Sequence, residues 1–69
     1  MRTNLRKYRF ECGDLSQQEL ADIVKVSRQT IVAIEKGDYN LSVKLALILA
    51  KKLNTTVEEL FQLEEKDEI

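Results

Sequence analysis

Arg28 and Gln29 follow directly after Ser27, and they offer the most distinctive chemistry in the chain. An arginine can donate two hydrogen bonds to O6 and N7 of guanine, and a glutamine amide can pair with N6 and N7 of adenine. Each such contact discriminates between bases by about 1–3 kcal/mol. Exposed at the start of a helix, the two side chains would be suited to reading double-stranded DNA. An ordinary solvated helix face is the alternative.

Catalytic and metal chemistry have little support in this composition. The chain contains no histidine and a single cysteine, Cys12. A Cys/His zinc site, a histidine base and an intrachain disulfide are therefore excluded. We expect no enzyme activity, no metal and no cofactor. Cys12 is predicted to be a reduced thiol packed near the end of the first helix, and a redox sensor is the alternative.

Two helix-start signals position Arg28 and Gln29. Ser16 is followed three residues later by Glu19, the capping-box pattern, which predicts a helix over residues 17–24. Ser27 caps a second helix over residues 28–36, and Gly37 ends it because glycine adopts left-handed backbone at little cost. The pair is therefore predicted to be a helix-turn-helix over about residues 16–37.

The second of these helices has distinct inner and outer faces. Ile31 and Ile34 are three residues apart and mark the buried face. The residues that fall off that face are Arg28, Gln29, Val32, Ala33 and Lys36. Val32 is apolar where water is expected, so it is either a scattered surface hydrophobe or a contact to a thymine methyl group.

Three further helices complete an all-α domain. The first covers residues 4–12, with Asn4 or Thr3 as its cap and Gly13 as its stop. Another covers residues 43–53 after Ser42, and because it is apolar nearly all round we expect it to be buried and central. One of its apolar stripes is also available to a subunit interface.

The C-terminal part should contain a short fifth helix and an acidic tail. Thr56 and Glu59 form a second capping-box pattern, which predicts a helix over residues 57–61. Residues 62–65 are suited to a short strand that pairs with the N-terminal residues, and the tail beyond should fray. We place the DNA-binding domain at residues 1–63 and the acidic tail at residues 64–69.

Length and charge agree with a small DNA-binding domain. The 69 residues suffice for one small core, so self-association is plausible. The net charge of −1 conceals ten basic and six acidic residues in 1–52, against one lysine and six acids in 53–69. With no signal peptide and no apolar run longer than Leu45–Ala50, the expected location is the cytoplasm.

The segments LSQQELA, VSRQTI and IEKGDYN together resemble the phage-repressor/Cro-like (XRE-class) helix-turn-helix family, specifically its small single-domain transcriptional regulators. The likeness covers roughly residues 4–63. It implies a compact five-helix lambda-repressor-like domain that binds operators as a dimer. A short pair of terminal strands is compatible with this fold. The likeness also implies that Glu35 pairs with an arginine of the first helix, for which Arg9 is the candidate.

The resemblance and the outer-face pattern assign two groups of DNA-contacting residues. The base-facing group is Ser27, Arg28, Gln29, Val32 and Ala33. The group that contacts the DNA backbone is Gln17, Thr30, Lys36, Tyr39 and Asn40. In the family, Gln17 matches a position that often places a side chain and a backbone amide on a phosphate, and Tyr39 and Asn40 match the loop that grips the far phosphates.

We therefore expect sequence-specific binding of double-stranded DNA by a transcriptional regulator, a repressor, as a homodimer on a palindromic operator. The predicted dimer surface is Leu60, Phe61 and Leu63, and the alternative for Leu60 and Phe61 is the monomer core. The rival function is an antitoxin or protein-interaction module of a toxin–antitoxin pair, because that class uses the same fold.

Overall fold

The computed structural model describes residues 1–37 and 40–67. Within these residues, four of the five α-helices are capped at their N-terminus by a serine or threonine side chain. These helices are α2 (Gln17–Val24), α3 (Arg28–Lys36), α4 (Val43–Lys52) and α5 (Val57–Leu60). In each, the hydroxyl of the preceding residue accepts a hydrogen bond from the N–H three positions later. The predicted starts of all four helices are confirmed.

Helix α1 (Leu5–Glu11) is one residue shorter at each end than predicted. Asn4 precedes it but does not cap it with its side chain. The Asn4 amide instead donates to the carbonyl oxygen of Glu59 at 2.9 Å, so this side chain joins α1 to α5. Cys12 ends the helix, is half-buried as expected, and donates from Sγ to the carbonyl oxygen of Leu53 at 3.2 Å.

The predicted second capping box forms only in part. Thr56 caps α5, but the carboxylate of Glu59 accepts a hydrogen bond from the hydroxyl of Tyr8 at 3.2 Å. Helix α5 also ends at Leu60, before the predicted Phe61, because Phe61 takes up extended backbone with φ −130° and ψ 133°. This conformation starts the strand that follows.

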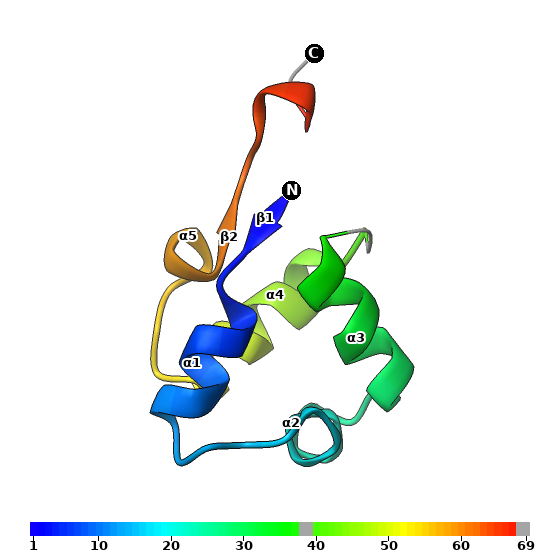
Figure 1. Cartoon of the computed structure of the whole chain (residues 1–69), viewed down its shortest axis with the longest axis vertical. Helices are drawn as coiled ribbons and strands as arrows, with labels where there is room; N and C mark the ends of the chain where they lie inside the picture. Colours follow the sequence, from blue (N-terminus) through cyan, green and yellow to red (C-terminus); the bar gives the residue numbers. More distant parts are fainter. Residues whose placement is uncertain (38–39, 68–69) are drawn as a thin grey trace.

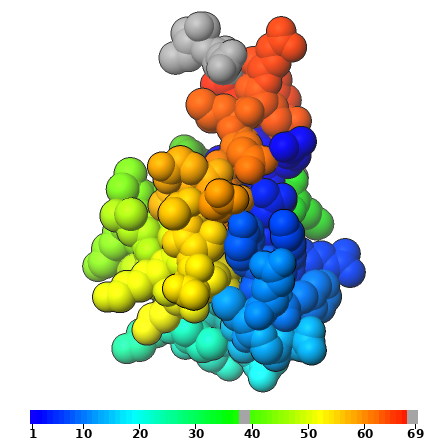
Figure 2. Space-filling model, turned by 90° about the vertical axis from the view of Figure 1, so that its left-hand side faces the viewer, coloured from blue at the N-terminus to red at the C-terminus, as the bar shows by residue number. Residues whose placement is uncertain are grey.

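Two short strands join the ends of the chain, as predicted. Strand β1 (Arg2–Thr3) pairs antiparallel with β2 (Phe61–Gln62), with Arg2 opposite Gln62 and Thr3 opposite Phe61. The strand therefore begins one residue before the predicted range 62–65. A 3-10 turn at Glu65–Asp67 follows, and Figure 2 shows this segment standing above the helical body.

The core takes its largest residues from all five helices. Leu5, Leu20, Ile31, Ile34, Leu49, Leu53 and Leu60 are fully buried. In Figure 1 the helices surround this common centre, with α4 behind α1 and α3. The prediction of Leu60 as a dimer contact is wrong, because this side chain is 0% exposed within the monomer.

Helix α4 is only partly the buried helix that its composition predicts. Its inner side buries Ala46, Leu49 and Ala50, whereas Val43 and Leu47 are 76% and 57% exposed. The two exposed residues are four apart and therefore share one face. Among the described residues, no helix combines the length and the apolarity needed to cross a membrane.

Candidate nucleic-acid interface

The turn between α2 and α3 is fixed by backbone conformation and by two hydrogen bonds. Lys25 ends α2 in the left-handed region, with φ 61° and ψ 46°, and its N–H donates to the carbonyl oxygen of Ala21. The N–H of Val26 donates to the same carbonyl at 3.0 Å. Ser27 then caps α3 with extended backbone. The two helices are packed closely, so the start of α3 has a defined place beside α2.

The outer face of α3 is the part of this unit that remains open to a ligand. Ile31 and Ile34 are fully buried and fix the inner face. Arg28 and Gln29 are exposed, and their side chains make no hydrogen bond or ion pair with the other described residues. Both occupy the first helical turn, where side chains reach furthest into a groove.

The other residues predicted to contact bases are less available to a ligand than Arg28 and Gln29. Val32 and Ala33 are half-buried on the outward side of α3. Ser27 is exposed, but its hydroxyl accepts from the N–H of Thr30 at 3.2 Å and lies 2.9 Å from the Thr30 hydroxyl. The hydroxyl of Ser27 therefore caps α3, and both the N–H and the hydroxyl of the half-buried Thr30 contact it.

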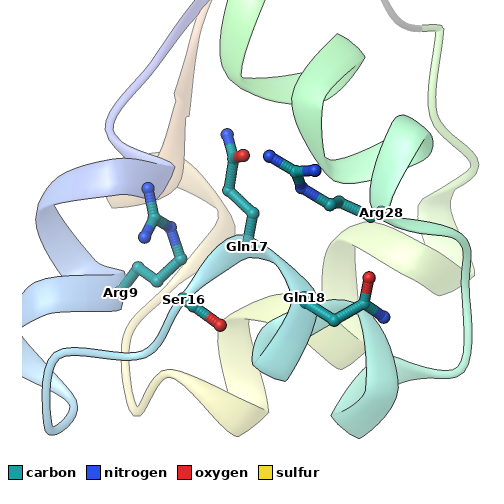
Figure 3. Close-up of a pocket in the computed structure, with 5 residues that line it drawn as sticks. All are labelled: Arg9, Ser16, Gln17, Gln18 and Arg28. Atoms are coloured by element: carbon teal, nitrogen blue, oxygen red, sulfur yellow. The ribbon is translucent and has the colours of Figure 1, made fainter.

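An open hollow of about 400 Å³ lies between the first turns of α2 and α3 and the side of α1. Its lining residues are Arg9, Ser16, Gln17, Gln18 and Arg28. Figure 3 shows that Arg9 comes from α1, whereas the side chains of Gln17 and Arg28 extend toward one another from α2 and α3. The first N–H groups of α2 have no partner within their helix, so this end of the hollow is suited to an anion.

A buried ion pair forms the α1 wall of this hollow. Nε of Arg9 donates to Oε2 of Glu35 at 2.9 Å, and the two side chains are 8% and 12% exposed. Arg9 also donates from Nη1 to the carbonyl oxygen of Leu15 at 2.7 Å. The Arg9–Glu35 pair that the resemblance implied is confirmed. Gln17 joins it, because its amide nitrogen donates to Oε1 of Glu35 at 3.1 Å.

The capping box fixes the start of α2. The N–H of Ser16 donates to the carboxylate of Glu19 at 2.8 Å, and this bond holds the pKa of Glu19 below its ordinary value. Glu19 is therefore ionised at neutral pH, where it stabilises the positive end of the helix dipole.

Three lining residues, Arg9, Ser16 and Gln18, were not among the predicted DNA contacts. Ser16 and Gln18 border the hollow, and Gln18 donates from Nε2 to the Asp22 carboxylate at 2.9 Å. Ser16 was predicted as the cap of α2 and Gln18 as part of its first turn, and these positions were the available signal. Lys36 and Asn40 are exposed, whereas Tyr39 lies outside the described residues. No group of three or more possible metal ligands occurs within the described part of the chain.

Comparisons with known proteins agree on one family. The family described as Helix-turn-helix matches residues 5–60. An uncharacterized HTH-type transcriptional regulator of Archaeoglobus fulgidus is 43% identical over 67 residues, covering 97% of this chain and 94% of that protein. The control protein C.SmaI of Serratia marcescens is 40% identical over 57 residues, covering 83% and 67% of the two chains. The restriction-modification controller protein C.AhdI of Aeromonas hydrophila superposes with a TM-score of 0.71 at 37% identity, covering 83% and 85%.

Proposed function

This chain belongs to the helix-turn-helix family of DNA-binding transcriptional regulators, and we propose that it binds a palindromic operator sequence-specifically as a homodimer and acts as a repressor. Members of this family are DNA-binding proteins, not enzymes. The matched proteins are named as transcriptional regulators and control proteins, so the antitoxin alternative is not favoured.

The observation that supports base reading is the contrast between the two faces of α3. Ile31 and Ile34 hold the helix rigidly in the core, while Arg28 and Gln29 are exposed and uncommitted at its start. A helix inserted into the major groove by its N-terminal end would bring these two side chains to base edges. Ser27, Val32 and Ala33 would border the same bases, with Val32 suited to a thymine methyl group.

Contacts to the DNA backbone would then set the register of α3. We assign these to Gln17, Thr30, Lys36, Tyr39 and Asn40. For Gln17 the group offered to a phosphate is the backbone N–H of the first turn of α2, because its amide nitrogen already donates to Glu35. Such contacts raise affinity without carrying sequence information.

Self-association would place two recognition helices on the operator, roughly 34 Å apart on one side of the duplex. Of the predicted dimer residues, Leu63 is 71% exposed and Phe61 is half-buried against the core. We propose Leu63 as the apolar contact, with the exposed pair Val43 and Leu47 as the competing surface. Leu63→Asp and Leu47→Asp, compared by sedimentation, would identify which one carries the dimer.

We assign DNA binding to residues 1–63, with the acidic tail 64–69 outside the interface, since negative charges next to phosphates would weaken binding. Repression would follow from occupancy, because a bound dimer excludes other proteins from the same bases. We also propose a cytoplasmic location, because the matched relatives come from archaea and bacteria, whose DNA lies in the cytoplasm.

Selection of bound sequences from a random pool of duplex DNA tests these proposals together. The expected result is an inverted repeat whose half-sites are about one helical turn apart. Failure to enrich any sequence would contradict sequence-specific binding. Enrichment of a single asymmetric half-site would contradict the homodimer.

A further inference from the structure

Phe10 is an exposed aromatic residue that the packing of the core does not explain. It lies on α1 with 47% of its surface exposed, and it is outside the apolar cluster of the molecule. The Cζ atom of Arg6 lies 5.5 Å from the centre of its ring, and that of Arg9 lies 5.1 Å away. Attraction between a cation and the electron-rich face of the ring favours both contacts.

The two guanidinium groups on this ring differ in how their charge is balanced. Arg9 is paired with Glu35 and almost fully buried, so it contributes little net charge to the surface. Arg6 is exposed and makes no ion pair with any other described residue. The ring therefore holds an unbalanced positive charge at a defined place on α1.

That place borders the hollow described above. Phe10 and Arg6 do not line the hollow themselves, but Arg9 does, and its Cζ lies 5.1 Å from the centre of the Phe10 ring, so the ring connects Arg6 to a residue of the hollow. Arg6 and Phe10 are four residues apart, which puts them on one face of the helix. Figure 2 shows the α1 surface, in blue, adjoining the start of α2, in cyan, below it.

We propose that Arg6, held against Phe10, binds a DNA phosphate beside the one that reaches the first turn of α2, so that the interface extends onto α1. This inference rests on the proposed DNA-binding function. A guanidinium group has five N–H donors, so one that lies over a ring keeps N–H groups for phosphate oxygens. Because the Arg6 side chain is already held over the ring, it loses less conformational freedom on binding. Phe10 is thus a positioning residue.

The test is the salt dependence of binding to a short mixed-sequence DNA duplex, followed by fluorescence anisotropy. Each phosphate neutralised by the protein contributes about 0.9 to the slope of log affinity against log salt concentration. Arg6→Gln is expected to reduce the slope by about 0.9 and the affinity roughly tenfold at about 0.1 M salt. A slope equal to that of the unmodified protein would overturn the proposal.

Lys7→Gln is the matched control. Lys7 is exposed on the same helix and also lies over a ring, with Nζ 5.6 Å from the centre of Tyr8. Tyr8 donates to Glu59 of α5, so this cation lies on the side of α1 away from α2. Removing its charge should leave the slope unchanged. Equal losses in the two variants would indicate a general charge effect and overturn a specific contact at Arg6. If the unmodified protein shows no salt dependence, the proposed function itself fails.

Phe10→Leu tests the positioning role, with Phe10→Tyr as the conservative variant that keeps the ring. We expect Phe10→Leu to weaken DNA binding and Phe10→Tyr to restore it. The double variant with Arg6→Gln should bind no more weakly than Arg6→Gln alone. Additive losses would show that Phe10 acts independently of Arg6, and would overturn this part of the proposal. Thermal unfolding of each variant checks that the fold is retained.

Discussion

Arg9 and Arg28 line the same hollow, yet their environments are opposite. Arg9 is almost fully buried, and its guanidinium group donates to Glu35 and to the carbonyl oxygen of Leu15. Arg28 is exposed and makes no side-chain bond with the described residues. The first arginine joins α1 to α3 and determines the shape of the hollow. The second is available to whatever occupies it.

The difference separates an arginine that is committed to the fold from one that is free to make the proposed contact with DNA. A buried ion pair is strongly sensitive to loss of one partner, because the remaining charge has no compensation. An exposed, uncommitted arginine has little effect on folding. Stability and DNA affinity should therefore respond separately to substitution at these two positions.

The largest effect is expected when the buried pair is broken. Among the described residues, Arg9→Ala leaves the carboxylate of Glu35 with the Gln17 amide as its one remaining partner, and we expect a loss of about 3 kcal/mol in the free energy of unfolding. Urea unfolding followed by circular dichroism measures it, with Arg28→Ala as the control. Equal stability of the two variants would contradict a structural role that belongs to Arg9 and not to Arg28.

Arg28→Ala should have its effect on DNA and not on folding. We expect a loss of about 1–3 kcal/mol in operator binding and a relaxed preference at one base position. The unfolding free energy should change by no more than about 0.5 kcal/mol. Binding to a panel of singly substituted operators measures this. A uniform loss across all sequences would assign Arg28 to the DNA backbone instead.

Lys25 lies in the turn between α2 and α3, and this turn determines where Arg28 lies relative to α2. The Lys25 φ of 61° is unfavourable for a residue with a side chain, so Lys25→Gly should stabilise the protein by about 1 kcal/mol. Asn54 has φ 55° and is a residue type that tolerates this conformation, so Asn54→Gly should gain less. Thermal unfolding compares the two, and equal gains would disprove this account of the turn.

The smallest effect concerns an exposed counterpart of the buried pair. The Met1 ammonium lies 2.7 Å from Asp67 and 3.3 Å from Glu64. The hydrogen bond with Asp67 raises the pKa of the Met1 amine, and the same bond lowers the pKa of Asp67. Their small contribution to stability should be complete between the ordinary pKa values of 3.8 and 8.0.

Below that range the contribution of Asp67 is lost as pH falls through its lowered pKa, and above it that of the amine is lost as pH rises through its raised pKa. Thermal unfolding across pH, repeated for Asp67→Asn, measures this dependence. Salt should weaken this pH dependence, because both groups are partly exposed to solvent. A pH dependence unchanged by Asp67→Asn would contradict the assignment to this pair.

The starts of α2 and α3 and the end of α3 follow from the sequence because their determinants are local. Ser16 with Glu19, Ser27, and Gly37 with its φ of 80° each act within a few residues of the helix end that they define. The resemblance to the phage-repressor/Cro-like family is confirmed, and it alone indicated Arg9 as the partner of Glu35.

Details that depend on distant partners could not be predicted. Glu59 bonds Tyr8 instead of completing a capping box, and Asn4 bonds the carbonyl of Glu59 instead of capping α1. Gln17 donates its amide to Glu35, 18 residues away. The exposure of Leu47 depends on which side of α4 meets the core. No local pattern in the sequence encodes these choices.

Gly37 takes part in both a local and a long-range feature of the fold, because it ends α3 and also lies against Met1. Its φ is left-handed, and a Cβ at this position would overlap the carbonyl oxygen of Met1. During folding, α3 can form from local contacts, whereas β1 must wait for β2, some 60 residues away, to close the chain. Any larger residue at position 37 would therefore obstruct a late step, so the end of α3 also influences how the chain finishes folding.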